Sequence, residues 1–193
     1  MPKPFAKSQY GKLRSVTPQI QRSPPNRTVN HVGVTVPDCE AAVEWYTKVL
    51  GFRKLQGNIS VIDRSVNPEA AIFRIYGEQC KKLKLGCLTS GNGVGLEIFE
   101  WIDPKMSHPS EFAYTRGGFF HMAITDSDPE ALLAKVLQAG GKRIGETVWP
   151  FAPGEDDEVV YFSDPWGNTF EVVSCSWEQL MGNRGGLDKM GQT

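Results

Sequence analysis

Two alternating runs that each begin with a histidine recur in this chain, and each is followed later by a similar run that holds a glutamate. The histidines are His31, in Asn-His-Val-Gly-Val-Thr, and His121, in Phe-His-Met-Ala-Ile-Thr. The glutamates are Glu97, in Gly-Leu-Glu-Ile-Phe, and Glu171, in Thr-Phe-Glu-Val-Val, and in both cases a glycine stands four residues earlier. A chain that repeats the same marked segments in the same order is constrained to fold as two equivalent halves.

The alternation of apolar with small or polar residues in these runs is typical of β-strands, in which residues two apart share a face. His31 then shares its face with Gly33 and Thr35. His121 shares its face with Ala123. The small neighbours leave space beside each imidazole, while the opposite face of each strand is apolar and suited to the core. The two histidine strands and the two glutamate strands could therefore bring four ligands to one metal ion.

A single histidine or glutamate on a strand is more often half-exposed than bound to a metal. The matched positions in two repeats favour ligands here. The third histidine, His108, lies in a segment with proline and serine and is expected to be solvated. Glu100 falls on the opposite face of its strand from Glu97, where we expect a solvent-facing carboxylate.

The segments after each histidine predict the element order β-α-β-β-β in both halves. In the first half Asp38 is placed to cap a helix that ends at Gly51. In the second half Asp128 is placed to cap a helix that Gly140-Gly141 ends. Further strands are expected near 52–57, 70–76 and 82–88 in the first half, and near 143–148 and 158–163 in the second.

The first half is longer than the second. The histidine and the glutamate are 66 positions apart in the first half and 50 positions apart in the second. The extra residues are expected to enlarge loops around 58–70 or 77–94, where they could form part of a substrate mouth.

The halves define one domain, 29–175, between two terminal extensions. We expect a basic proline-containing arm at 1–28, module one at 29–101, a polar linker at 102–116, module two at 117–175 and a C-terminal tail at 176–193.

Charge is distributed unevenly along the chain. The arm holds six Lys or Arg and no acid, while the rest of the chain holds 15 basic residues against 22 acidic ones. An acidic body does not suggest nucleic-acid binding. The prolines of the arm argue against the amphipathic helix of a mitochondrial targeting peptide. We therefore favour a docking or disordered arm, with mitochondrial targeting as the alternative.

The chain shows no sign of secretion or membrane insertion. No apolar run approaches the ~18 residues of a membrane span, and no signal-peptide core is visible. Four cysteines form no CxxC motif and no close pair, which favours reduced thiols over disulfides or a zinc site: Cys39, Cys80, Cys87 and Cys175. We expect a cytoplasmic protein that binds neither membranes nor nucleic acid.

Two further motifs accompany the marked strands. The first helix ends in Leu50-Gly51-Phe52, and the turn Asp-Pro-Trp-Gly-Asn, 164–168, leads into the Glu171 strand. Together with the marked strands, they resemble the vicinal oxygen chelate superfamily, also called the glyoxalase/bleomycin-resistance/extradiol-dioxygenase superfamily, over about residues 29–175. The resemblance implies an α+β fold of two βαβββ modules that form a cupped, half-closed mixed sheet around a metal site. The ligand order His, Glu, His, Glu resembles the glyoxalase I branch.

The donor set points to a class of chemistry. Two neutral imidazoles and two carboxylates neutralise a divalent ion, and such a mixed set suits Zn, Ni, Co, Mn or Fe(II). An octahedral ion would keep two positions at which adjacent oxygens of a substrate could chelate, and it would stabilise an enolate or enediolate as a Lewis acid. In the enzymes that the chain resembles, a metal-bound glutamate can loosen and act as the general base. That residue is Glu171 or Glu97 here, and we favour Glu171.

The substrate of a chain like this is not set by the motifs. The chain lacks a recognisable basic cluster of the kind that glutathione-binding glyoxalases use. Trp166 also stands in the turn where the family commonly has a small or acidic residue. Several aromatic residues near the proposed cup make a small aromatic or apolar substrate plausible: Phe99, Trp101, Phe119, Trp149 and Tyr161.

Three functions remain open. The favoured one is a metal-dependent lyase, isomerase or epimerase. The second is an extradiol-type dioxygenase, which would use two His and one carboxylate; a fourth ligand, Glu97, argues against it. The third is a small-molecule-binding protein without catalysis, and the intact ligand set argues against that. A homodimer is expected, and the sequence leaves open whether the ligands meet within one chain or across two.

Overall fold

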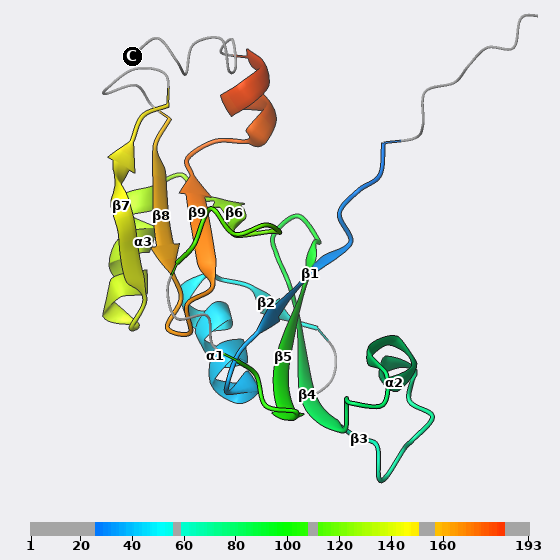
Figure 1. Cartoon of the computed structure of the whole chain (residues 1–193). Coiled ribbons are helices and arrows are strands. Elements are labelled where there is room, and N and C mark those ends of the chain that lie inside the picture. The colour runs from blue at the N-terminus through cyan, green and yellow to red at the C-terminus, as the bar shows by residue number, and fades with distance from the viewer. Residues whose placement is uncertain (1–25, 56–58, 108–111, 151–156, 184–193) are drawn as a thin grey trace, which may run out of the picture.

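Two open β-sheets, one from each module, form the framework of the computed structural model, which describes residues 26–55, 59–107, 112–150 and 157–183 (Figure 1). Module one contains β1 (His31–Thr35), α1 (Cys39–Val49), β2 (Arg53–Lys54), β3 (Ser60–Asp63), α2 (Ala71–Tyr76), β4 (Lys82–Thr89) and β5 (Gly95–Asp103). Module two contains β6 (Met122–Thr125), α3 (Pro129–Gln138), β7 (Lys142–Val148), β8 (Val159–Ser163) and β9 (Thr169–Val173), followed by a π-helix, η1 (Glu178–Asn183).

The sheet of module one has the order β1-β5-β4-β2, and β3 also pairs with β4. β1 lies parallel to β5 with Gly33 opposite Glu97, whereas the remaining pairs are antiparallel. The predicted capping of α1 is confirmed, because the Asp38 carboxylate accepts a hydrogen bond from the backbone N–H of Ala41 and Gly51 takes a positive φ of 72° just after the helix. The parallel pair brings the histidine strand beside the glutamate strand.

Module two repeats this arrangement with the sheet order β6-β9-β8-β7. β6 lies parallel to β9 with Ala123 opposite Glu171. Asp128 caps α3 by accepting from the backbone N–H of Ala131, and Gly140 follows the helix with a φ of 86°. The predicted α+β fold of two modules with mixed sheets is therefore confirmed, and His121 stands immediately before β6.

The strand predicted near 70–76 is wrong, since these residues form helix α2, and the strand that pairs with β4 is β3. Phe73 is the buried residue of α2 and packs with Leu83 and Phe99 on the sheet. Arg64 ends the helix by donating to the carbonyl of Gly77, 2.6 Å away, while its guanidinium lies 4.3 Å from the centre of the Phe73 ring. Tertiary contacts thus decide the conformation of a segment that is too short for periodicity to settle.

The largest hydrophobic cluster spans both modules. The apolar faces of both sheets and one side of each long helix contribute to it, including Val32, Ile98, Met122 and Phe170. α1 and α3 also contact each other, since the Trp45 indole donates to the carbonyl of Ala139 at 2.9 Å. Both helices therefore lie on the inner side of the sheets, and α2 lies on the opposite side of the first sheet (Figure 1).

The chain's remaining features have simple placements. The four cysteines are free thiols, as predicted, and all but Cys87 are buried. Leu180 of η1 is buried against Val159 and Val173 of the second sheet. Within the described residues, each helix is too short or too polar to cross a membrane. Residues 1–25 of the basic arm, His108 and residues 184–193 lie outside the described residues.

Candidate metal centre

The histidine and glutamate of module one face each other on neighbouring strands. His31 Nε2 lies 3.4 Å from Glu97 Oε2, and the two side chains are 50% and 33% exposed. The other ring nitrogen, Nδ1, lies 2.7 Å from the amide oxygen of Asn30. Because an amide oxygen can only accept, His31 donates from Nδ1, and Nε2 is the ring nitrogen that faces the carboxylate.

Module two repeats the pair. His121 Nε2 lies 3.1 Å from Glu171 Oε2, and these side chains are 26% and 15% exposed. Phe120 stands where Asn30 stands in module one, so its side chain offers no acceptor. His121 Nδ1 is buried and has no hydrogen-bond partner among the described residues. The pair of module two is therefore the more enclosed one, and its imidazole is held by fewer polar contacts.

Within each pair, the distance between the histidine nitrogen and the glutamate oxygen fits two ligands of the same ion. Two atoms that each lie ~2.1 Å from one metal are about 3.0 Å apart at a right angle and about 3.4 Å apart at a tetrahedral angle. The measured separations are 3.1 and 3.4 Å. In each module a histidine nitrogen faces a carboxylate oxygen, and a cation between them would bind both atoms. The donor chemistry and the spacing thus suit a divalent metal.

The four residues do not form one cluster within the chain. Within the described residues, no three of their ligand atoms lie within 4.8 Å of one another. The alternation of the strands explains this separation, because both pairs lie on the sheet faces that point away from the shared core. The structure thus brings the residues together as two pairs, and convergence of all four on one ion stays a prediction.

A different acidic group does converge, but it already has a partner. Asp38, Glu40 and Glu100 bring carboxylate oxygens within 4.8 Å of one another beside α1. Lys84 Nζ lies 2.9 Å from Glu40 and 3.2 Å from Glu100, and Glu100 also accepts from the backbone N–H of Cys39. The expectation of a solvent-facing Glu100 is therefore wrong. Its strand face lies under the start of α1, whose free N–H groups and the nearby lysine need an acceptor.

Strand register places one neighbour opposite each glutamate: Cys87, which the sequence does not assign to the site, and Tyr161, which the sequence places only among the aromatic residues near the cup. Cys87 stands opposite Glu97, and partial desolvation together with the Glu97 charge raises the pKa of its thiol. Tyr161 stands opposite Glu171. Burial, the charge of Glu171 and a hydrogen bond with it raise the pKa of the Tyr161 phenol. Only the pairing of β4 with β5 and of β8 with β9 reveals these neighbours.

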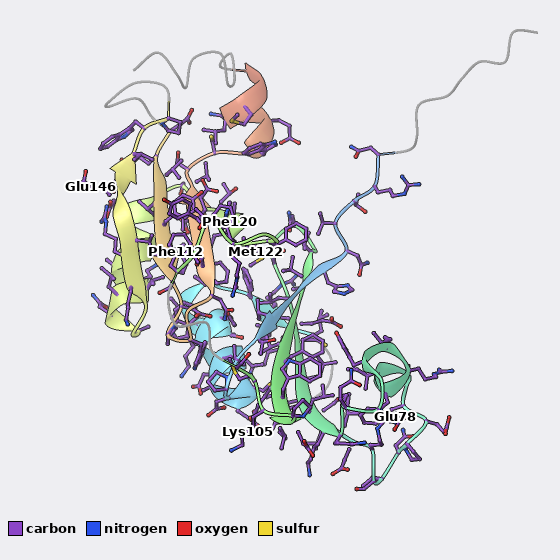
Figure 2. The ribbon with its side chains drawn as sticks, viewed as in Figure 1. Glu78, Lys105, Phe112, Phe120, Met122 and Glu146 are labelled. Atoms are coloured by element: carbon purple, nitrogen blue, oxygen red, sulfur yellow. The ribbon has the colours of Figure 1, made fainter. Side chains whose placement is uncertain are left out.

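Aromatic residues line parts of the same faces. Phe99 and Trp101 stack at 5.3 Å on the outer face of the first sheet, and Tyr76 of α2 meets Trp101 edge-on. A pocket of about 240 Å³ adjoins His121 at the junction of the modules, where Figure 2 shows Phe112, Phe120 and Met122 near one another. Its polar lining includes Thr35, Arg116, Asn168 and Thr169.

Known proteins resemble this chain in sequence and in fold. Residues 28–172 match the model of the Glyoxalase/Bleomycin resistance protein/Dioxygenase superfamily. A 2-epi-5-epi-valiolone epimerase from an Actinomyces species is 27% identical over 149 residues, which cover 76% of this chain and 78% of that protein.

Two solved structures extend the comparison. A glyoxalase family protein from Bacillus cereus has a TM-score of 0.61 at 13% identity and covers 80% of this chain and 97% of its own. The fosfomycin resistance protein FosX from Listeria monocytogenes, solved with Mn(II) and sulfate, has a TM-score of 0.51 at 12% identity with coverages of 80% and 97%. At these sequence identities, the similarity to the two solved structures shows only that the fold is shared. The sequence match, however, spans most of the chain and includes all four His and Glu positions, and the chain therefore belongs to the glyoxalase/bleomycin resistance protein/dioxygenase superfamily.

Proposed function

We propose that this protein is a metal-dependent enzyme of the epimerase or isomerase type. It acts on a small substrate with adjacent oxygen atoms, and His31, Glu97, His121 and Glu171 bind the ion. The observation that carries the proposal is the repeated pair, in which a histidine nitrogen faces a glutamate oxygen at 3.4 Å in one sheet and 3.1 Å in the other. The epimerase named among the relatives and the Mn(II) bound by FosX support the same class of reaction and of ion.

A divalent ion at this position supplies Lewis-acid stabilisation of the negative charge that develops on the substrate oxygen. The residues of the chain supply the rest. Glu171 is the more enclosed carboxylate and removes the proton from the carbon beside the carbonyl group. Glu97 is the more exposed one and serves as a ligand.

The proposal includes a homodimer, in which His31 and Glu97 of one protomer share an ion with the partner's His121 and Glu171. The two pairs of one chain lie on faces turned away from the shared core and do not converge, which favours a site completed by a second protomer. The surface beside His121 is also rich in exposed apolar residues, and a patch of this kind marks an interaction site. These residues are Phe112, Tyr114, Phe119 and Phe120, of which Phe119 is fully exposed.

Exchange of a substrate hydrogen with solvent tests the proposed reaction. We expect the protein loaded with Mn²⁺ or Zn²⁺ to incorporate deuterium from D₂O into a ketone that carries a neighbouring hydroxyl group. The panel should include 2-epi-5-epi-valiolone, the compound in the name of the relative. Proton NMR follows the loss of the signal at the carbon beside the carbonyl. EDTA should abolish exchange, and added metal should restore it.

The same assay separates the competing functions. Product formation that requires O₂ and occurs without solvent exchange would favour the dioxygenase. Tight substrate binding without any turnover would favour the binding protein. Each glutamate faces its own histidine, which gives four candidate ligands. The metal site of an extradiol-type dioxygenase needs only two histidines and one carboxylate. We therefore rank the epimerase or isomerase first.

A further inference from the structure

The two half-sites differ in what stands across from each glutamate. In module one the position is Cys87, whose thiol is a weak hydrogen-bond donor. In module two the position is Tyr161, whose phenol is a stronger donor. Side chains directly opposite on antiparallel strands have Cβ atoms about 4.5–5.5 Å apart. The sequence repeat thus gives the two carboxylates different environments.

Tyr161 is held between the candidate ligands and a small apolar cluster. Its ring packs on Val159, Val173 and Leu180 and meets the His121 imidazole edge-on, with 5.4 Å between the ring centres. Its position directly opposite Glu171 brings the phenol beside that carboxylate, and burial, the charge of Glu171 and hydrogen bonding to it raise the pKa of the phenol. The ring is therefore fixed by packing on one side, while its other neighbours are the His121 ring and, across the strand pair, Glu171.

We propose that Tyr161 is a positioning residue that holds the Glu171 carboxylate in place against His121 for metal binding. This inference rests on the proposed function. A free glutamate side chain samples several rotamers, and a phenol donor beside the carboxylate restricts this freedom while Oε2 faces the histidine. Partners of this kind around metal ligands typically change metal affinity by about 10–100-fold.

Metal titration of the full-length protein tests the inference without a substrate. We expect Tyr161→Phe to raise the dissociation constant for Mn²⁺, measured by calorimetry, by about 10–100-fold. Phe keeps the ring in its apolar cluster, and the melting temperature of the metal-free variant checks that the fold is unchanged. Tyr76→Phe is the matched control, because Tyr76 lies on α2 and its ring contacts Phe99 and Trp101. It should bind Mn²⁺ as the wild type does.

A double-mutant comparison separates positioning from packing. In a Glu171→Ala background there is no carboxylate to hold, so Tyr161→Phe should cause no further loss of Mn²⁺ affinity. Equal losses in both backgrounds would overturn the inference, and so would a Tyr161→Phe variant that binds like the wild type. If the wild type itself binds no Mn²⁺, Zn²⁺, Co²⁺ or Ni²⁺, the proposed function fails and the inference fails with it.

Discussion

Glu171→Gln should lower the rate of solvent-deuterium exchange by about 10²–10⁴-fold, the usual contribution of a general base, while leaving a metal ion bound. Glutamine keeps a carbonyl oxygen that can coordinate, but it does not accept a proton at neutral pH. The loss should therefore appear in the exchange rate of the metal-loaded protein. Single-turnover exchange by NMR and metal content by mass spectrometry, performed on the same sample, give the two quantities.

Glu97→Gln is the matched control for this substitution, because Glu97 occupies the equivalent position in module one. If Glu97 is only a ligand, its variant should lose exchange activity in proportion to lost metal and no further. Equal losses in the two variants, both explained by metal content, would show that neither glutamate is the base. The proton acceptor would then have to be another group near the ion.

Asp164→Ala should give a large loss of stability, with the free energy of unfolding lowered by roughly 3–5 kcal/mol because several buried donors lose their acceptor. Asp164 is 1% exposed. It accepts from the Tyr46 hydroxyl at 2.5 Å, the Asn168 amide at 2.8 Å and two backbone N–H groups in its own turn. Burial raises the pKa of its carboxyl, and the hydrogen bonds from Tyr46 and Asn168 oppose that shift. The carboxylate thus links α1 of module one to the turn before β9.

Urea unfolding followed by circular dichroism measures this effect, and two variants calibrate it. Tyr46→Phe removes one donor to the same carboxylate and should cost about 1.5–3 kcal/mol, the range for a hydrogen bond to a charged group. Asp128→Ala removes only the exposed cap of α3 and should cost about 1 kcal/mol. An Asp164→Ala variant no less stable than Asp128→Ala would contradict the structural role assigned to this carboxylate.

Much of the fold is encoded in local sequence signals. The alternation around His31 and His121 predicts the strands because one face of each is packed against the shared core. The helices are equally clear, since Asp38 and Asp128 each satisfy a backbone N–H in the first turn and glycines with positive φ follow the last turn. These features depend on neighbours within a few residues, and a single sequence displays them.

Other features depend on contacts between segments that are distant in sequence, and local sequence patterns do not predict them. Helix α2 forms where the sequence predicts a strand, because Phe73 is buried on the sheet and Arg64 donates to the carbonyl of Gly77 just after the helix. The Glu100 carboxylate forms an ion pair with Lys84 and accepts a hydrogen bond from the backbone N–H of Cys39 at the start of α1. The pairing of each histidine with its glutamate follows from parallel strands that are far apart in sequence. The relative placement of the two pairs is set by how the helices pack between the sheets, which alternation does not determine.

A mixed dimer tests most directly whether the four residues bind one ion across two chains. The two chains carry different affinity tags. One chain has the substitutions His31→Ala and Glu97→Ala, and the other has His121→Ala and Glu171→Ala. In their heterodimer, isolated by sequential affinity steps, one shared site keeps all four ligands and the other keeps none. We expect one Mn²⁺ or Zn²⁺ per heterodimer and none in either mutant homodimer. A heterodimer that binds no ion, beside a wild type that does, would contradict a shared site.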